Sequence, residues 1–161
     1  REQIKFYRKY QKVFQFGTFY RYDTDADHEQ WQVLKDDVSM VGVFRRLGSA
    51  APGFEKICIY ALDPEKEYHV TTRSQTVNFS RVGGNINYLS PIKINPNGPL
   101  FFVVDQRLHI TAATEDRTHS GRALAGGFVP MPLFAGSGYD GNQRLVSDGG
   151  SELYVIEETG R

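Results

Sequence analysis

The spacing of the hydrophobic residues changes at Gly17, and this change limits the fold more than any other feature of the sequence. Before it, residues 1–16 contain no Gly or Pro, and Tyr7, Tyr10 and Phe14 recur at the i, i+3, i+7 spacing of one helix face. After it, short runs rich in aromatic and β-branched residues alternate with turn residues. We therefore predict one amphipathic helix that ends at Gly17 and a β-rich body that follows it.

The body, residues 17–161, contains many short candidate strands separated by turn signals. This pattern predicts an all-β fold, an antiparallel β-sandwich preceded by the one N-terminal helix. The 13% share of aromatic residues and the 16 Gly support strands and turns, because flat rings pack well on a pleated surface. We accordingly divide the chain into a helical segment, 1–16, and a sandwich domain, 17–161.

Hairpins and turns can be assigned from local chemistry. Asp36-Asp37 is predicted to join a strand that carries Trp31 and Val33 on one face to the strand 38–45. The strand 38–45 has apolar residues at both alternating positions, so we expect it to be buried on both faces.

A second turn is expected at Asp63-Pro64, because Asp accepts a backbone hydrogen bond and Pro presets φ. The other strands that we predict are 18–22, 54–61, 67–72, 81–88, 92–94, a hairpin of 100–104 with 107–113 joined at Asp105-Gln106, and 153–156. The stretch 120–150 is Gly-rich and is predicted to be irregular.

Charge and cysteine content exclude several classes of function. The 19 basic and 19 acidic residues cancel, so no overall field attracts nucleic acid or an anionic membrane surface. No apolar run approaches the roughly 20 residues that span a bilayer. Cys58 is the single cysteine, so an intrachain disulfide and a thiolate metal cage are both impossible. We expect its thiol to pack in a buried strand as a small hydrophobe.

Catalytic and metal-binding patterns are missing from the sequence. Glycoside hydrolysis needs two carboxylates that face one bond, and none of the candidate acids has a sequence context that indicates this role. These acids are Asp105, Glu115, Asp116, Asp140 and Asp148, of which we expect Asp105, Asp140 and Asp148 to lie in turns. The four histidines, His28, His69, His109 and His119, show no helical pair. We therefore predict no catalytic residue, no cofactor and no metal.

Aromatic residues supply the candidate binding positions. The stripe of Tyr7, Tyr10 and Phe14 needs a cover, which can be a neighbouring domain, a second copy of the chain or the sandwich itself. Trp31 is a candidate for stacking on a sugar ring, although its place in a predicted strand equally indicates a core residue.

Several motifs together resemble the C-terminal region of α-galactosidases of glycoside hydrolase family 36. They are FYRKY at 6–10 with FQFGTFYR at 14–21, QWQV at 30–33 with VGVFR at 41–45, LDP at 62–64 with Tyr68, and SG at 120–121 with AL at 123–124 and DGGSELY at 148–154. Ala61 and Gly149 stand where that family has Gly and Phe. The likeness is weakest over 75–116, and the order and spacing of the motifs carry it.

This resemblance implies a cytoplasmic, bacterial-type enzyme that hydrolyses terminal α-galactosides with retention. The chain would be its non-catalytic C-terminal domain, with residues 1–16 as the end of the catalytic barrel and the barrel as the packing partner. The family's Lys-Trp-Asp nucleophile motif and its acid/base motif have no counterpart here, so no catalytic residue is carried over. A chain that starts at Arg1 and not at Met is expected to be a fragment or a trimmed product. A carbohydrate-binding module and a free-standing interaction domain remain the alternatives.

Overall fold

The computed structural model describes residues 1–23, 28–46, 56–73, 76–78, 97–107, 109–111, 114–130 and 150–160, with single residues at 87, 91, 93 and 95. Its elements are α1 (Glu2–Phe16), β1 (Thr18–Asp23), β2 (His28–Lys35), β3 (Val38–Arg45), β4 (Glu67–Thr72), β5 (Thr76–Asn78), α3 (Pro99–Arg107), β6 (His109–Thr111), β7 (Asp116–Ser120), α4 (Gly121–Gly126) and β8 (Ser151–Glu158). Among the described residues, each helix lacks the length or the apolar character needed to cross a bilayer.

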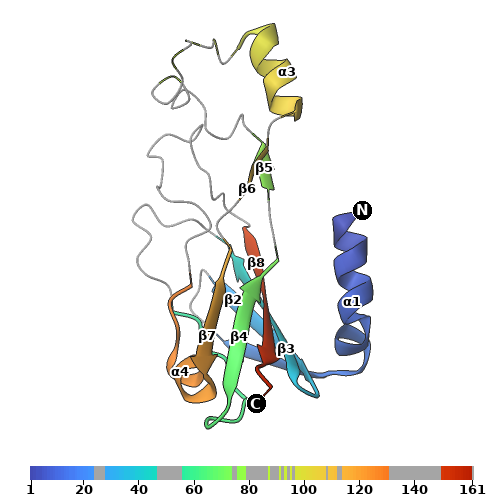
Figure 1. The fold of residues 1–161 in the computed structure, drawn as a ribbon, viewed down its shortest axis with the longest axis vertical. Coiled ribbons are helices and arrows are strands. Elements are labelled where there is room, and N and C mark those ends of the chain that lie inside the picture. Colours follow the sequence, from blue (N-terminus) through green and yellow to red (C-terminus); the bar gives the residue numbers. More distant parts are fainter. Residues whose placement is uncertain are drawn as a thin grey trace.

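Six strands form one antiparallel sheet in the order β1-β2-β3-β8-β4-β7 (Figure 1). The last strand of the chain, β8, lies inside the sheet and joins the N-terminal strands to β4 and β7. A separate two-stranded ribbon, β5–β6, lies between the large sheet and α3 (Figure 1). The predicted all-β antiparallel fold with one N-terminal helix is therefore confirmed.

The predicted hairpin of β2 and β3 is confirmed at its turn and in its register. Asp36 adopts a φ of 52°, a left-handed conformation that Asp tolerates better than most residues. Met40 and Val41 are neighbours that point to opposite faces of the sheet, and both are fully buried. The strand 38–45 is thus buried on both faces, as its apolar residues at both alternating positions predict.

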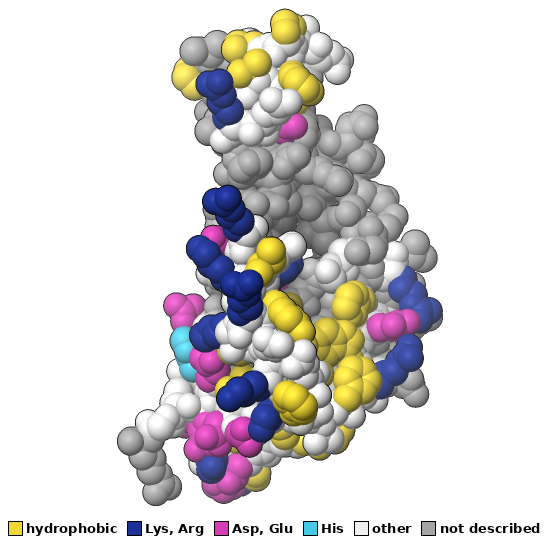
Figure 2. All heavy atoms as spheres, turned by 90° about the vertical axis from the view of Figure 1, so that its right-hand side faces the viewer, with side chains coloured by type: hydrophobic (Ala, Val, Ile, Leu, Met, Phe, Trp, Pro, Cys, Tyr) yellow, Lys and Arg dark blue, Asp and Glu magenta, His cyan; other side chains and the backbone are white. Residues whose placement is uncertain are grey.

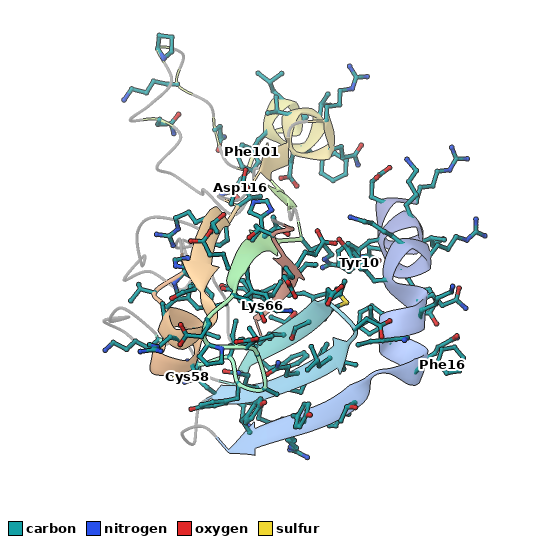
Figure 3. All side chains as sticks on the ribbon, turned by 60° about the horizontal axis from the view of Figure 1, so that its bottom comes forward. Tyr10, Phe16, Cys58, Lys66, Phe101 and Asp116 are labelled. Carbon is teal, nitrogen blue, oxygen red and sulfur yellow. The ribbon has the colours of Figure 1, made fainter. Side chains whose placement is uncertain are left out.

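Helix α1 covers one face of the sheet. Its residues Tyr10 and Val13 form a core with Val33, Met40 and Val155. Phe6, Phe14, Trp31, Val38 and Leu153 pack around this core. In Figure 3, Tyr10 points from the helix toward the strands, whereas Phe16 points away from them. The helix is attached to the sheet by Tyr10 and Val13, with Phe6 and Phe14 packed beside them.

A second layer covers the opposite face of the sheet. Its core joins Val41, Val70, Tyr154 and Ile156 of the sheet to side chains of the covering segments, which are Ile57, Ile59, Leu124 and Phe128. The covering backbone makes one bridge between Ile57 and Phe128, and it is helical in α4. The arrangement is sandwich-like, but in the described residues this layer is not a second large sheet.

Gly17 ends α1, as predicted, although the reason is different from a left-handed helix cap. Its φ of −78° is open to any residue. A Cβ at this position would lie 2.5 Å from the Val13 carbonyl oxygen and 2.6 Å from Cγ1 of Val33. Glycine is required here because the chain turns sharply and the helix end lies directly against β2.

Three sequence-based assignments are wrong. The predicted hairpin of 100–104 and 107–113 is replaced by the helix α3 and the short strand β6, so Asp105 lies in a helix and not in a turn. The predicted strand 54–61 is described only from residue 56 onward. In that part Ile57 makes a single bridge to Phe128, and no regular strand pairing is formed. The stretch 120–150, predicted to be irregular, begins with the helix α4.

Two further assignments concern residues that are hardly described. The strands predicted at 81–88 and 92–94 lie outside the described residues, apart from residues 87 and 93.

Strand β7 was not predicted, because its sequence, DRTHS, is polar and carries no apolar alternation.

Candidate functional site

The three predicted interface residues of α1 have different environments. Tyr10 is 7% exposed and belongs to the core, and its hydroxyl donates a hydrogen bond of 3.1 Å to Oε1 of Glu157. Phe14 is half-buried, and its ring stacks on that of Tyr7 at 5.9 Å. Tyr7 is 45% exposed. Tyr10 therefore attaches the helix to its own sheet, while Tyr7 leaves an aromatic surface open.

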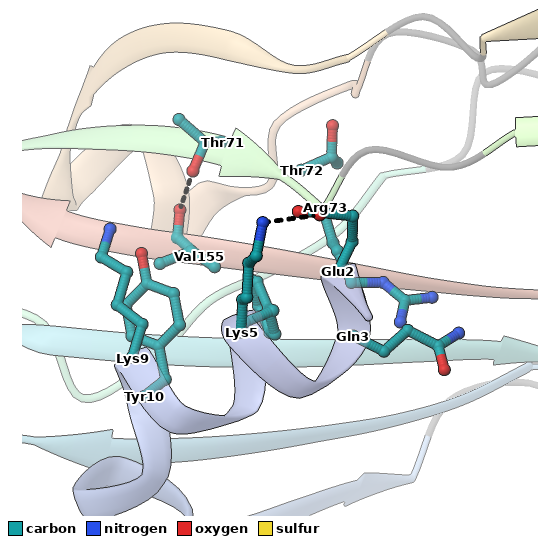
Figure 4. A pocket seen from close by; sticks show the side chains of 10 residues that line it. Glu2, Gln3, Lys5, Lys9, Tyr10, Thr71, Thr72, Arg73 and Val155 are labelled. Carbon is teal, nitrogen blue, oxygen red and sulfur yellow. Dashed lines mark hydrogen bonds and ion pairs between the residues drawn. The ribbon is translucent and has the colours of Figure 1, made fainter.

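A groove of about 870 Å³ lies between α1 and the strands β4 and β8 (Figure 4). Charged and polar side chains of the helix form one wall of it, and the end of β4 forms the other. The lining residues are Glu2, Gln3, Lys5, Phe6, Lys9, Tyr10, Thr71, Thr72, Arg73 and Val155.

Two lysines of this groove have partners on the helix itself. Lys5 donates to Glu2 at 2.8 Å, and Nζ of Lys9 lies 4.6 Å from the centre of the Tyr10 ring. Burial raises the pKa of Tyr10, and the hydrogen bond to Tyr10 raises the pKa of Lys9. At neutral pH Tyr10 is therefore protonated and Lys9 is cationic, so neither can act as a base.

The candidate acids in the described residues have partners of their own. Glu115 is fully buried and is held by Arg117, whose Nη2 donates to Oε2 at 2.8 Å and also to the Val129 carbonyl at 2.9 Å. Asp116 lies on the opposite face of β7 and meets His69 at 2.6 Å. Asp140 and Asp148 lie outside the described residues.

Glu115 is buried and Asp116 is exposed, so these two neighbouring carboxylates are not arranged to face one bond. Among the described residues, no three His, Cys, Asp or Glu side chains are grouped so that they could hold a metal ion. His119 packs beside the ring of Phe128 at 5.5 Å.

Trp31 lies on the helix side of the sheet. It is half-buried against the α1 core, and a Cβ added to Gly42 on the neighbouring strand would overlap its indole ring. The ring therefore lies flat on the Gly42 backbone, and the geometry accounts for the Trp–Gly pair in the QWQV and VGVFR motifs.

The glutamines beside Trp31 attach the second layer to the sheet. Gln32 is fully buried; its Nε2 donates to the Tyr60 carbonyl at 2.7 Å and to Oγ of Ser39 at 2.9 Å. Gln30 donates to the carbonyl of the half-buried Cys58 at 2.6 Å. Sequence reasoning missed this role, although a polar residue on a core-facing position of a strand is a usable signal.

Two further motifs that resemble the family, LDP at 62–64 with Tyr68 and SG at 120–121, contact each other in the fold. Tyr68 is buried, and its hydroxyl accepts a hydrogen bond of 3.0 Å from the Asp63 backbone N–H. Ser120 caps α4 by accepting from the Ala123 N–H, and Gly121 lies so close to the Asp63 carbonyl that a Cβ would overlap it. Leu124, the last residue of the motif, is fully buried in the core. The conformation of the chain therefore accounts for these motifs.

Comparison with known proteins finds likeness in structure alone. No protein-family model matches the sequence, and no curated protein sequence matches it. The structure resembles the α-galactosidase from Lactobacillus brevis, with a TM-score of 0.59 and 20% identity; the match covers 99% of this chain and 16% of that chain.

Two further solved structures show the same relation. The family 36 α-galactosidase AgaA from Geobacillus stearothermophilus, determined with raffinose, has a TM-score of 0.57 at 18% identity, with 98% and 15% of the two chains covered. The galactosidase domain of the α-galactosidase–sucrose kinase AgaSK has a TM-score of 0.56 at 19% identity, again with 98% and 15% covered. The chain thus has the fold of about one sixth of a family 36 α-galactosidase.

Proposed function

We propose that this chain is a non-catalytic C-terminal domain of an α-galactosidase and that it packs on the catalytic barrel of the same polypeptide. The proposal rests on the share of each chain that the structural matches cover. Nearly the whole chain, 98–99%, matches a small part, 15–16%, of three α-galactosidase structures. A match of this kind is expected for one domain cut from a larger enzyme.

The roles of the motif residues support this reading. Gln32, Gly42, Tyr68 and Leu124 all lie in motifs that resemble the family, and each has a packing or hydrogen-bonding role in this fold. Fold does not by itself establish function, so the assignment to α-galactosidases also rests on the sequence motifs.

The parent enzyme is then expected to hydrolyse terminal α-D-galactosides with retention, in the cytoplasm of a bacterium. Within it, residues 1–16 would end the barrel and residues 17–161 would form the sandwich. Helix α1 would be shared between them, because one of its sides already packs on the sheet.

The test uses the complete coding region and the segment 1–161, assayed side by side on an aryl α-galactoside. The complete protein should hydrolyse it, whereas the segment should not, because a positioned general acid alone contributes about 10²–10⁴-fold in rate. Turnover by the purified segment contradicts the non-catalytic role. A complete protein that acts on another glycoside instead contradicts the assignment to α-galactosidases.

A further inference from the structure

The two edge strands of the large sheet differ in their chemistry. At one edge, β7 has the polar sequence DRTHS, with Asp116 and Arg117 side by side, and α4 lies against it. At the other edge, β1 has the sequence TFYRYD, with three aromatic residues and one basic residue. It contains no Pro or Lys and pairs with β2 over all six residues without a bulge. Charges, prolines, bulges and covering elements are the features that keep edge strands from pairing, and β1 has few of them.

The two layers that cover the sheet stop short of β1. On one face, α1 packs on Val33 of β2, Met40 of β3 and Val155 of β8. On the other face, the core of the second layer contacts Val70 of β4 and Ile156 of β8. Among the described residues, neither core includes a side chain of β1. Figure 3 accordingly shows β1 as the lowest strand of the sheet, with none of the described elements beyond it.

The backbone of β1 is therefore prepared for a further strand. In an antiparallel pair, successive residues alternate between those whose N–H and C=O groups bond to the neighbouring strand and those whose groups point away from it. The unbroken pairing with β2 means that about half of the backbone groups of β1 point outward, at regular spacing. An added strand can bond to these groups without any change in the sheet.

Aromatic side chains lie on both faces of this edge. On the helix side, Phe19 is 60% exposed and stacks on Trp31 at 6.3 Å. On the opposite face, the rings of Tyr20 and Tyr22 lie 6.5 Å apart and are nearly parallel. Figure 2 shows hydrophobic side chains gathered on the strands beside α1. A strand added at β1 would extend the aromatic contacts on both faces if it also carried alternating aromatic residues.

From this geometry we infer that β1 pairs with β1 of a second copy of the chain, so that two sheets join across a two-fold axis. In antiparallel self-pairing one residue lies opposite its own copy. With Tyr20 on the axis, Tyr20 faces Tyr20, Phe19 faces Arg21 and Thr18 faces Tyr22, all of which are compatible cross-strand pairs. An axis at Arg21 would set two arginines opposite each other, which is unfavourable. The inference uses only the edge and its register, so it is independent of the proposed function.

The other edge of the sheet is a poorer partner for β1. Pairing β1 with β7 of a neighbour would be head-to-tail and would leave a free edge on each new copy, whereas β1 with β1 closes at two copies. The contact would be small, because residues 18–22 are far fewer than the roughly 20–30 residues a side of a standard interface. We therefore expect a weak dimer with a dissociation constant in the micromolar range.

Charge exchange at Tyr20 tests the pairing in the complete protein, with self-association measured by analytical ultracentrifugation. Tyr20→Lys would place two lysines opposite each other, and Tyr20→Glu two glutamates, so each variant alone should associate about tenfold more weakly than wild type. An equimolar mixture should recover the association, because Lys then faces Glu, and this recovery also shows that both variants are folded. Thr118→Lys and Thr118→Glu, at an exposed position of β7, are the matched controls and should change nothing.

Three results of the charge exchange overturn the inference. The first is a wild-type protein that stays monomeric up to about 100 µM, a concentration well above a micromolar dissociation constant. The second is equal association of the wild type and the Tyr20 variants. The third is weakened association of both Tyr20 variants that their mixture does not recover.

Disulfide cross-linking measures the register itself, in a Cys58→Ser background. Two copies of Tyr20→Cys on the axis would have Cα atoms about 4.5–5.5 Å apart, a distance that a disulfide spans. Tyr22→Cys, two residues from the axis, is the control, because its copies would be about 14 Å apart. Oxidation should therefore link only Tyr20→Cys, as a dimer of the tryptic peptide 13–21 in mass spectra. Linkage of Tyr22→Cys instead, or of neither variant, overturns the inference.

Discussion

Replacing Gln32 with Leu tests how the second layer is attached to the sheet. Gln32 is fully buried, and its amide makes hydrogen bonds to both backbone groups of Tyr60 and to the hydroxyls of Ser39 and Tyr22. Leucine has a similar volume but can make none of these bonds. The buried Ser39 hydroxyl and the Tyr60 carbonyl would then lose their partner.

The cost can be estimated group by group. A buried polar group left without a partner costs about 1–3 kcal/mol, so two such groups cost roughly 2–6 kcal/mol. The extra apolar surface that Leu buries returns about 1–2 kcal/mol. With the middle of each range, Gln32→Leu should therefore lower the unfolding free energy by about 2.5 kcal/mol. Gln106→Leu, at an exposed position of α3, should change it by less than about 0.5 kcal/mol.

Urea unfolding of the two variants measures this difference. With a slope near 2 kcal/mol per M, the midpoint of Gln32→Leu should fall by about 1–2 M. A second variant, Gln32→Glu, adds a check of mechanism. A buried carboxylate cannot donate to the Tyr60 carbonyl, but a protonated one can, so the deficit relative to wild type should shrink as the pH falls toward about 4. A midpoint for Gln32→Leu within about 0.3 M of wild type would refute the reasoning.

Three other outcomes follow from the structure. Gly42→Ala should displace the Trp31 ring from the β3 backbone and lower the unfolding free energy by about 1–3 kcal/mol. The fluorescence emission of Trp31, the single Trp of the chain, should then shift, and an unchanged spectrum contradicts the packing of the ring on Gly42. Burial raises the pKa of Tyr10, so the folded chain binds this phenol proton more tightly than the unfolded chain does. The resulting contribution to the unfolding free energy is complete below the ordinary tyrosine pKa of about 10. It is lost as the pH rises through the higher pKa of the folded chain. Tyr10→Phe should flatten the fall in unfolding free energy above about pH 9, and an unaltered slope counts against it. Because Trp31 is half-buried against α1, calorimetry should detect no binding of galactose or raffinose tighter than about 1 mM, whereas a tighter site lost on Trp31→Ala would make sugar binding the function.

Local chemistry determined the elements that the sequence predicts correctly. The end of α1 at Gly17, the turns at Asp36-Asp37 and Asp63-Pro64, and the strand within 151–158 each depend on residues close together in the chain.

The errors arose where a short apolar run carries no distinct period. Residues 100–104 are continuously apolar, a pattern that suits a buried strand and a helix equally well, and the structure resolves it as the helix α3. The polar strand β7 was missed because its place depends on pairing with β4, which lies more than 40 residues earlier in the chain.

The sequence by itself determined that one aromatic-faced helix precedes a β-rich body and that its stripe must be covered. The tertiary structure alone decided what covers it. Tyr10 packs on the sheet, while Tyr7, which stacks on Phe14, remains 45% exposed. It also decided that β8, the last strand, lies between β3 and β4. The physical reason is that hydrophobic burial is non-directional, so a sequence pattern specifies that a face is buried but not against which distant segment.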